Sequence, residues 1–177
     1  YAVGSFHPLQ AISHPVTGAE RLPGSYVAVT GAPQAVAVAR RLTASLGSSI
    51  LTVPEARRPL YHAAAVMASN FLPPLIDVAC RLLERAGVPY DEALPALLPL
   101  VRGALSNIEE GGLDSSVTGP IPRGDVETVD LHLRALDPHD RRLYAMLGIE
   151  LVRIAGPMIP EDALKELLER FETEIDA

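Results

Sequence analysis

One predicted helix carries side chains that could move a proton. The spacing i, i+4, i+7 and i+8 joins His62, Val66, Ser69 and Asn70, and it places all four on one face of an α-helix. Alanines surround this polar stripe, so its side chains must find hydrogen-bond partners or face a wet cavity. Either they bond to neighbouring backbone, or the helix lines a substrate pocket. In that pocket His62 would transfer a proton, while Asn70 and Ser69 would orient the substrate.

A second group of polar candidates follows later in the chain. The segment "TGPIPRGD" (118–125) is stiffened by two prolines and holds Arg123 just before a predicted helix start. A guanidinium beside free backbone N–H groups suits a carboxylate or phosphate, which makes Arg123 and Thr118 substrate-binding candidates. Alternatively, Arg123 pairs with Asp125. Asn107, at the predicted end of a helix, either caps that helix or contacts substrate.

Composition excludes several classes of protein. The net charge is −7 and no basic cluster is present, which argues against nucleic acid as a partner. Cys80 is the only cysteine, so a disulfide framework and a cysteine-rich metal site are excluded. The five histidines have no metal-binding spacing. We see no signal peptide and no bilayer-spanning apolar run, and therefore expect a cytoplasmic protein that binds no membrane.

The elements that must position these residues differ between the two parts of the chain. Residues 1–55 read as α/β, with a helix from Pro33 and strands at 1–6, 25–31 and 48–53. The first strand would run into a loop that presents His7. Three strands and one clear helix predict an incomplete parallel sheet.

From residue 56 the pattern is helical. Pro73 and Pro74 should kink or split the first long helix, and residues 109–125 read as a loop. The predicted helices cover 57–86, 91–110, 125–136, 138–155 and 160–175. The predicted fold class is therefore α+β and mostly α, with a partial α/β region at 1–55 and an all-helical domain at 56–177.

Several strings together resemble a known family. "GSFHPLQ", "YHAAAVMASNF", "PLVRGALSNI", "TGPIPRGD" and "HLRAL" occur in this order. They resemble a bacterial Rossmann-like family whose C-terminal part is the domain of unknown function 2520 (DUF2520). That family is similar to the 6-phosphogluconate-dehydrogenase-like superfamily. The resemblance implies an NAD(P)-binding Rossmann domain, followed by a helical domain that forms a dimer and completes the active site.

The resemblance also implies roles for individual residues. In prephenate dehydrogenases a Gly-x-His-Pro loop follows a late Rossmann strand, and "GSFHPLQ" resembles it, so His7 becomes a catalytic candidate with Ser5 beside it as a substrate-binding one. Ketopantoate reductases carry Lys and Asn four residues apart on the corresponding helix. Here Val66 stands four before Asn70, and the nearest polar group is His62. No lysine acid is therefore available at that place, and the proton donor must be different or absent.

The glycine-rich dinucleotide loop of the family has no counterpart here. No G-x-G-x-x-G occurs in the sequence, so we expect an N-terminal Rossmann half to be missing and NADP or NAD to bind only the full-length protein. The implied function is the C-terminal part of an NAD(P)-dependent oxidoreductase that reduces a small 2-oxo acid or imine. The alternative is a non-catalytic helical module for dimerisation or ligand binding. Both imply a homodimer, built mainly from residues 57–110.

Overall fold

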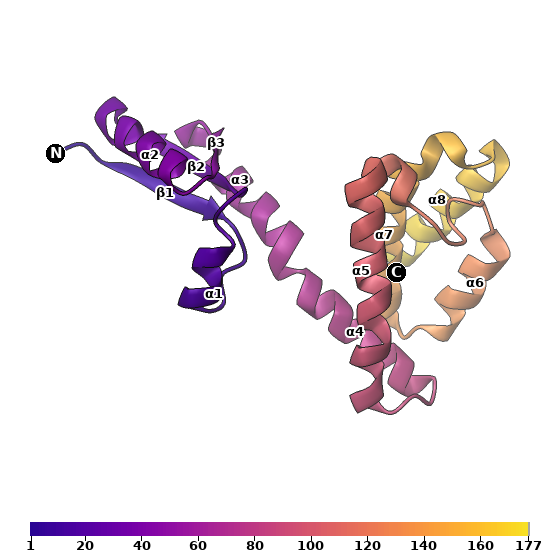
Figure 1. Cartoon of the computed structure of the whole chain (residues 1–177). Helices are drawn as coiled ribbons and strands as arrows, with labels where there is room; N and C mark the ends of the chain where they lie inside the picture. The colour runs from indigo at the N-terminus through magenta and orange to yellow at the C-terminus, as the bar shows by residue number, and fades with distance from the viewer. Residues whose placement is uncertain (177) are drawn as a thin grey trace. The chain divides into compact units, whose positions relative to one another are not determined.

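The computed structural model describes residues 1–176 and divides into two compact units (Figure 1). The N-terminal unit is Tyr1–Asp77 and the C-terminal unit is Val78–Ala177. A small sheet occurs in the first and the rest of the described chain is mostly helical, which confirms the predicted fold class. The sequence predicted a division after residue 55, between a Rossmann-like remnant and an all-helical domain. This division stays a prediction.

The N-terminal unit contains a three-stranded sheet of order β1-β2-β3. Its strands are β1 (Gly4–Leu9), β2 (Tyr26–Gly31) and β3 (Ser49–Thr52). Helix α2 (Pro33–Ser45) joins β2 to β3, which are parallel. Strand β1 is antiparallel to β2, so the prediction of a parallel sheet is wrong for this strand. A strand pattern reads the same in either direction, and the direction depends on the connection, which here contains only the short α1 (Pro15–Glu20).

Strand β1 also extends further than the sequence predicts. It runs through His7 and Pro8 to Leu9, so His7 lies within the strand and not in a loop after it. Pro8 is tolerated because β1 is an edge strand, whose outer side needs no N–H donor. At the other end Gly4 is paired with Gly31.

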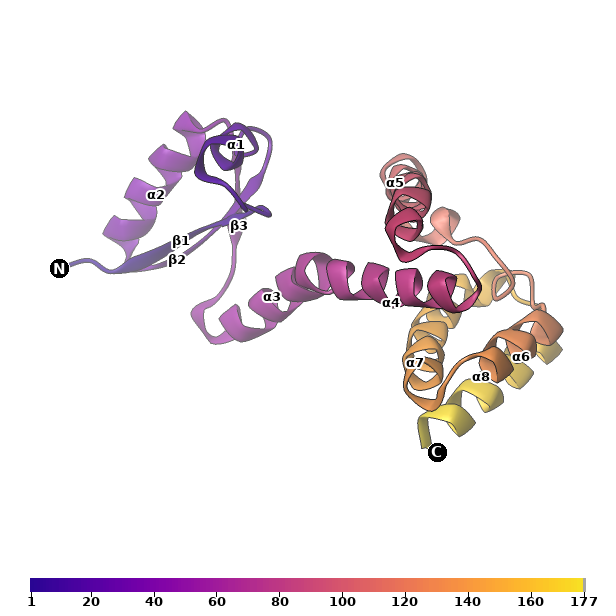
Figure 2. The same cartoon turned by 90° about the horizontal axis from the view of Figure 1, so that it is seen from below.

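The two faces of this sheet have different neighbours. Val27 and Val29 are buried and pack against Val36 and Ala39 of α2. Because side chains alternate along a strand, Ala28 and Thr30 of β2 point to the opposite face. Strand β1 places Ser5 opposite Thr30 and His7 opposite Ala28, so these four residues share the face that α2 does not cover. Figure 2 shows α2 and α3 on opposite sides of the sheet.

The long helix predicted at 57–86 is split, as its prolines indicate. After the short turn η1 (Glu55–Arg57) it consists of α3 (Arg58–Ala65), a π-helical turn η2 (Val66–Asn70) and α4 (Leu72–Arg85). In the π turn the N–H of Phe71 donates to the carbonyl of Val66, at 3.1 Å. Pro73 and Pro74 follow at the start of α4, where they have no N–H for α-helical bonds and crowd the preceding carbonyls. The π turn is the resulting adjustment.

The helix predicted to end at about residue 110 does have a break close to that position. Helix α5 (Tyr90–Ser116) continues through Pro95 and Pro99 to a kink at Gly112, where φ is 73° and the backbone is not helical. Residues 113–116 form one more helical turn after the kink, so the predicted loop at 109–125 begins later than expected. Its serines satisfy the helix instead of breaking it, because the hydroxyls of Ser115 and Ser116 donate to carbonyls one turn back. Asn107 lies about one turn before the kink at Gly112, near the end of the first helical stretch of α5.

Three further helices form the main core of the C-terminal unit. They are α6 (Val126–Ala135), α7 (Pro138–Ala155) and α8 (Glu161–Asp176), with a short turn η3 (Gly156–Met158) between the last two. Two aspartates cap the first two of these helices: Asp125 accepts from the N–H of Thr128, and Asp137 accepts from the N–H of Asp140. Asp91, a further cap candidate of the sequence, lies inside α5 instead, whose N-cap is Pro89. The buried core consists of Ile121, Val129, Leu133, Ala145, Val152, Ala155, Ile159, Leu167 and Phe171.

One helical stretch of the described chain leaves much apolar surface exposed. Glu55–Arg85 is long enough to cross a membrane. An 18-residue window within it has a mean hydropathy of 1.4, and only 6% of that window is buried inside the structure. This contrasts with the expectation that no such run exists. Length and composition are the whole of this evidence, and an apolar helix that packs against another protein chain meets the same criterion.

Candidate functional site

The sheet face opposite α2 carries a pocket of about 580 Å³. Strands β1 and β2, the segment after β3 and the start of α3 all contribute to it, and all of these belong to the N-terminal unit. Its lining consists of Ser5, His7, Ala28, Thr30, Val53, Glu55, Arg58, Pro59, Tyr61 and His62. Thr30 and Val53 lie at or just beyond the carboxyl ends of the two parallel strands, which is where open α/β sheets bind ligands.

An aromatic cluster forms one wall of this pocket. Nδ1 of His7 lies 2.7 Å from the hydroxyl oxygen of Tyr61, 54 positions away in sequence. The two rings meet edge to face, with centroids 5.6 Å apart. The rings of His7 and His62 also lie close, with centroids 6.2 Å apart. Strand β1 and helix α3 thus bring two imidazoles and a phenol into one pocket, where they can exchange protons with a ligand.

A row of hydroxyl and charged groups forms another part of the lining. Ser5 Oγ and Thr30 Oγ1 are hydrogen-bonded at 2.9 Å. Arg58 donates to Glu55 at 3.0 Å. Hydrogen bonds from Arg58, and secondarily from Thr30, lower the pKa of Glu55 below its usual value. The carboxylate therefore stays ionised and neutralises the one guanidinium in the lining.

The structure brings together only some of the predicted site residues. Ser5, His7 and His62 line the pocket. Ser69 and Asn70 lie in the π turn, are exposed, and are not among the lining residues. The smaller rotation per residue in a π turn also changes the single face that α-helical spacing predicted for residues 62–70.

The remaining candidates belong to the C-terminal unit. Arg123 lies 3.9 Å from Asp125, with the Arg123 side chain 65% exposed, so the pairing that the sequence left as an alternative is present. Asn107 and Thr118 are exposed. Their roles in substrate binding stay predictions.

Sequence reasoning missed four polar lining residues, Thr30, Glu55, Arg58 and Tyr61. Arg58 and Tyr61 could have been found, because they precede His62 by four residues and one residue and so share its turn of helix. Thr30 could not, because its place depends on the pairing of β2 with β1.

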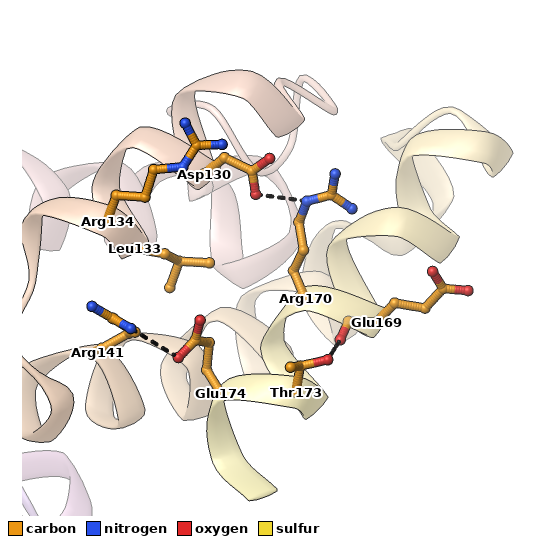
Figure 3. A pocket seen from close by; sticks show the side chains of 8 residues that line it. All are labelled: Asp130, Leu133, Arg134, Arg141, Glu169, Arg170, Thr173 and Glu174. Carbon is orange, nitrogen blue, oxygen red and sulfur yellow. Dashed lines mark hydrogen bonds and ion pairs between the residues drawn. The ribbon is translucent and has the colours of Figure 1, made fainter. Parts of the chain in front are cut away.

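A second hollow, of about 460 Å³, lies in the C-terminal unit among α6, α7 and α8 (Figure 3). Its charged groups largely satisfy one another: Arg170 donates to Asp130 at 2.6 Å, and Arg141 lies 3.5 Å from Glu174. Three arginines and three carboxylates line it, so their charges cancel. It contains none of the predicted site residues, and its charge favours neither anion nor cation.

Metal and dinucleotide binding can be tested against these residues. Within residues 1–176 no group of three or more His, Cys, Asp or Glu side chains could hold a metal ion. The turn from β2 into α2 contains Gly31, but a Cβ at this position would collide with the Cα of Gly4. Gly31 thus allows β1 to approach β2 closely. In addition, Pro33 has no N–H to offer at the start of α2. The described residues do not fit a dinucleotide pyrophosphate.

Two solved structures share this fold. Protein TM1727 from Thermotoga maritima superposes with a TM-score of 0.76 at 24% identity, covering 87% of this chain and 62% of that one. A "putative NADP oxidoreductase", BF3122 from Bacteroides fragilis, superposes with a TM-score of 0.67 at 26% identity, covering 85% and 57%. The chain thus spans about three fifths of the length of the solved structures it matches. No curated protein matches it.

The family comparison agrees with the resemblance found in the sequence. The model of the domain of unknown function DUF2520 matches residues 25–151. This match contains β2, β3, the helices α2 to α6 and most of α7. Because it covers more than half of the chain, it shows that this chain belongs to the DUF2520 family.

Proposed function

We propose that this chain supplies the substrate pocket of an NADP-dependent oxidoreductase that reduces a small 2-oxo acid or imine, or catalyses the reverse reaction. The observation that carries the proposal is the convergence of His7, Tyr61, His62 and Arg58 in one pocket at the carboxyl ends of parallel strands. The name of the Bacteroides fragilis protein supports the reaction class and the cofactor.

The pocket residues divide the proposed work between them. His62 or His7 would give a proton to the substrate's oxygen or nitrogen during reduction, and would take it back in the reverse direction. Ser5 and Thr30 would offer hydroxyls to polar groups of the substrate. These roles require the groups to reach one bound molecule, which a pocket of about 580 Å³ permits.

Arg58 is the proposed anchor for the substrate carboxylate. It is the one arginine that lines this pocket, and the Glu55 carboxylate already occupies the position that a substrate carboxylate would take. Because both side chains are more than half exposed, exchanging one carboxylate partner for another costs little. This role replaces Arg123 as the first choice for the anchor.

The proposal places the pyrophosphate of NADP outside these residues. Since the described chain does not fit that group, a longer polypeptide or a partner would have to hold it. Bound there, NADP would supply the hydride, and the residues of this chain would bind the substrate and manage its proton.

The proposal is tested with the natural protein that contains this chain. NADPH oxidation is measured with a panel of 2-oxo acids and imines. We expect His62→Ala to lower kcat about 100-fold through lost proton transfer, with Asn70→Ala as the test of the predicted orienting role. We expect Arg58→Ala to raise KM about 10-fold or more through the lost charged hydrogen bonds.

Arg153→Ala is the matched control for Arg58→Ala. Arg153 is also paired with a glutamate three residues earlier, Glu150, and is exposed, but it lies in α7 outside the pocket. Its kinetics should equal those of the unsubstituted protein. No oxidation with any member of the panel would refute the reductase function, and equal KM values for the two arginine variants would refute the carboxylate anchor.

A second candidate is a non-catalytic module for dimerisation. It is favoured by exposed apolar side chains of both units within 57–110. These are Leu60, Met67, Phe71 and Leu75 in the N-terminal unit, and Tyr90, Leu94, Leu100, Leu105 and Ile108 in the C-terminal unit. Under this candidate His62→Leu leaves both folding and biological function intact. A homodimer is part of both candidates.

A further inference from the structure

The surroundings of the hydrogen bond between Tyr61 and His7 indicate which of the two residues is the donor. The 2.7 Å separation fits either Tyr61 O–H donating to Nδ1, or Nδ1–H donating to the Tyr61 oxygen. In the second case the Tyr61 hydroxyl proton would need another acceptor. The described residues give this hydroxyl no hydrogen-bond partner besides Nδ1. The first arrangement therefore satisfies both groups within the protein, whereas the second leaves the hydroxyl proton of this exposed contact to solvent.

The protonation state of Tyr61 supports the same direction. Burial raises the pKa of the Tyr61 hydroxyl above its usual value of 10.0, so the phenol keeps its proton throughout the neutral range. A neutral phenol is a good donor, and the unprotonated nitrogen of imidazole is a good acceptor.

We propose that Tyr61 is a positioning residue that holds neutral His7 as the tautomer with the proton on Nε2. Nδ1 is then committed to Tyr61, and Nε2–H is the ring's only donor. Because His7 lines the pocket, this N–H is available to an oxygen atom of a ligand. The assigned tautomer makes neutral His7 a hydrogen-bond donor and not a base.

The consequence for chemistry rests on the function proposed above, whereas the tautomer does not. A donor aimed at a carbonyl oxygen would stabilise the negative charge that develops there during reduction. His62, whose ring lies beside that of His7, would then be the group that exchanges the proton. The inference thus divides the work between two histidines that the sequence left as equal candidates.

The chain contains a second pair with nearly the same geometry. Nδ1 of His132 lies 2.9 Å from the hydroxyl of Tyr144, with ring centroids 5.8 Å apart and planes at 83°. Burial also raises the pKa of Tyr144. This pair belongs to the C-terminal unit, so it is a matched control for a substitution in the pocket.

The test is ¹⁵N NMR of the histidine rings in this chain, at about pH 8.5, roughly two units above the usual histidine pKa. Signals are assigned by single His→Gln variants. We expect Nδ1 of His7 to resonate as a proton-free nitrogen and Nε2 as a proton-bearing one. In Tyr61→Phe both nitrogens should shift toward the averaged values of the exposed His139, while His132 stays unchanged. Tyr144→Phe should move His132 and leave His7 unchanged.

Two results would overturn the inference. One is a proton on Nδ1 of His7 in the unsubstituted chain, and the other is Tyr61→Phe leaving the His7 nitrogens unmoved while Tyr144→Phe shifts His132. The loss of only one hydroxyl is a mild change. Unaltered His132 signals in Tyr61→Phe verify that the C-terminal unit is folded, and an unaltered far-ultraviolet circular dichroism spectrum verifies the N-terminal unit. The measurement needs neither NADP nor substrate, so it can fail or succeed independently of the reductase assay.

Discussion

A single aspartate determines how α6 begins. Oδ1 of Asp125 accepts from the backbone N–H of Thr128 at 3.1 Å, and Oδ2 accepts from the Thr128 hydroxyl at 2.8 Å. These hydrogen bonds lower the pKa of Asp125 below its usual 3.8. A carboxyl whose folded-state pKa is depressed stabilises the fold fully above its unfolded-state pKa. That contribution is lost as the pH falls through the folded-state value.

This cap predicts a stability difference that depends on pH. Asp125→Asn removes the charge and keeps one acceptor oxygen, so the variant should melt at a lower temperature than the unsubstituted chain at pH 7. The difference should shrink below about pH 4, where the unfolded carboxyl takes up its proton, and should go on falling as the pH drops through the lower folded-state pKa. Thermal unfolding followed by circular dichroism across this range measures it.

Asp114→Asn is the control for this experiment, because Asp114 is exposed in α5. A melting difference for Asp125→Asn that is the same at pH 2 and pH 7 would contradict the charged role of the cap.

The residues that the sequence predicted correctly act locally, and those it missed act across the fold. The caps at Asp125 and Asp137 depend on N–H groups three residues away, so a short stretch of sequence contains the whole interaction. The contact of His7 with Tyr61 depends on the pairing of β1 and on the path of α3. No short stretch contains that information, although His7 and His62 were found as separate candidates.

At the scale of elements, the crossing of α7 and α8 depends on one missing side chain. Phe171 of α8 is fully buried. A Cβ at Gly148 of α7 would lie 2.6 Å from the end of the Phe171 ring, closer than real contacts allow. The small residue and the large one thus form a complementary pair in the core.

We expect Gly148→Ala to lower the free energy of unfolding by about 1–3 kcal/mol, because the added methyl forces the ring of Phe171 to move. Gly103→Ala is the matched control. Gly103 lies inside α5 with open space at its Cβ position, so alanine should stabilise the helix there by about 0.5–1 kcal/mol. Chemical denaturation of both variants gives the two values. The same sign of change in both would show that space around the Cβ is not the cause.

The order and type of the elements follow from the sequence more fully than their details. Periodicity and caps predict the helices from α2 to α8 in the right order. The antiparallel direction of β1 was missed because direction is a property of the pairing and not of the strand. The helical turn at 113–116, after the kink at Gly112, was missed because glycine and serine usually mark loops. Here the hydroxyls of Ser115 and Ser116 donate to backbone carbonyls of the preceding turn.

At the scale of the whole molecule, many apolar side chains of α3 to α5 are exposed and could be buried by another protein chain. Leu100 is 70% exposed and Met67 is 68% exposed, and neighbours of the same kind lie along 57–110. Exposed apolar surface of this kind is typical of protein–protein interfaces. We propose that a second copy of the chain covers them.

Sedimentation at micromolar concentration should therefore give the mass of two chains. Leu100→Glu should shift the mass toward one chain, because a buried and unpaired carboxylate is costly at an interface. Leu131→Glu is the control, since Leu131 is also a leucine on a helix surface, 57% exposed, but lies in α6. A single-chain mass for the unsubstituted protein, or equal effects of the two variants, would count against a dimer through 57–110.

The paired glycines at the end of β1 have a consequence for the history of this protein. A side chain at Gly31 would strike the backbone of Gly4, and one at Gly4 would lie 2.8 Å from the Thr30 carbonyl and from Ala35. Since backbone forms the obstacle, no compensating mutation of a neighbouring side chain could relieve it. A lineage that replaces either glycine must shift the backbone of β1 against β2, and His7 would move with that strand. In a distant relative, the survival of this glycine pair would therefore tell whether the pocket has been inherited or lost.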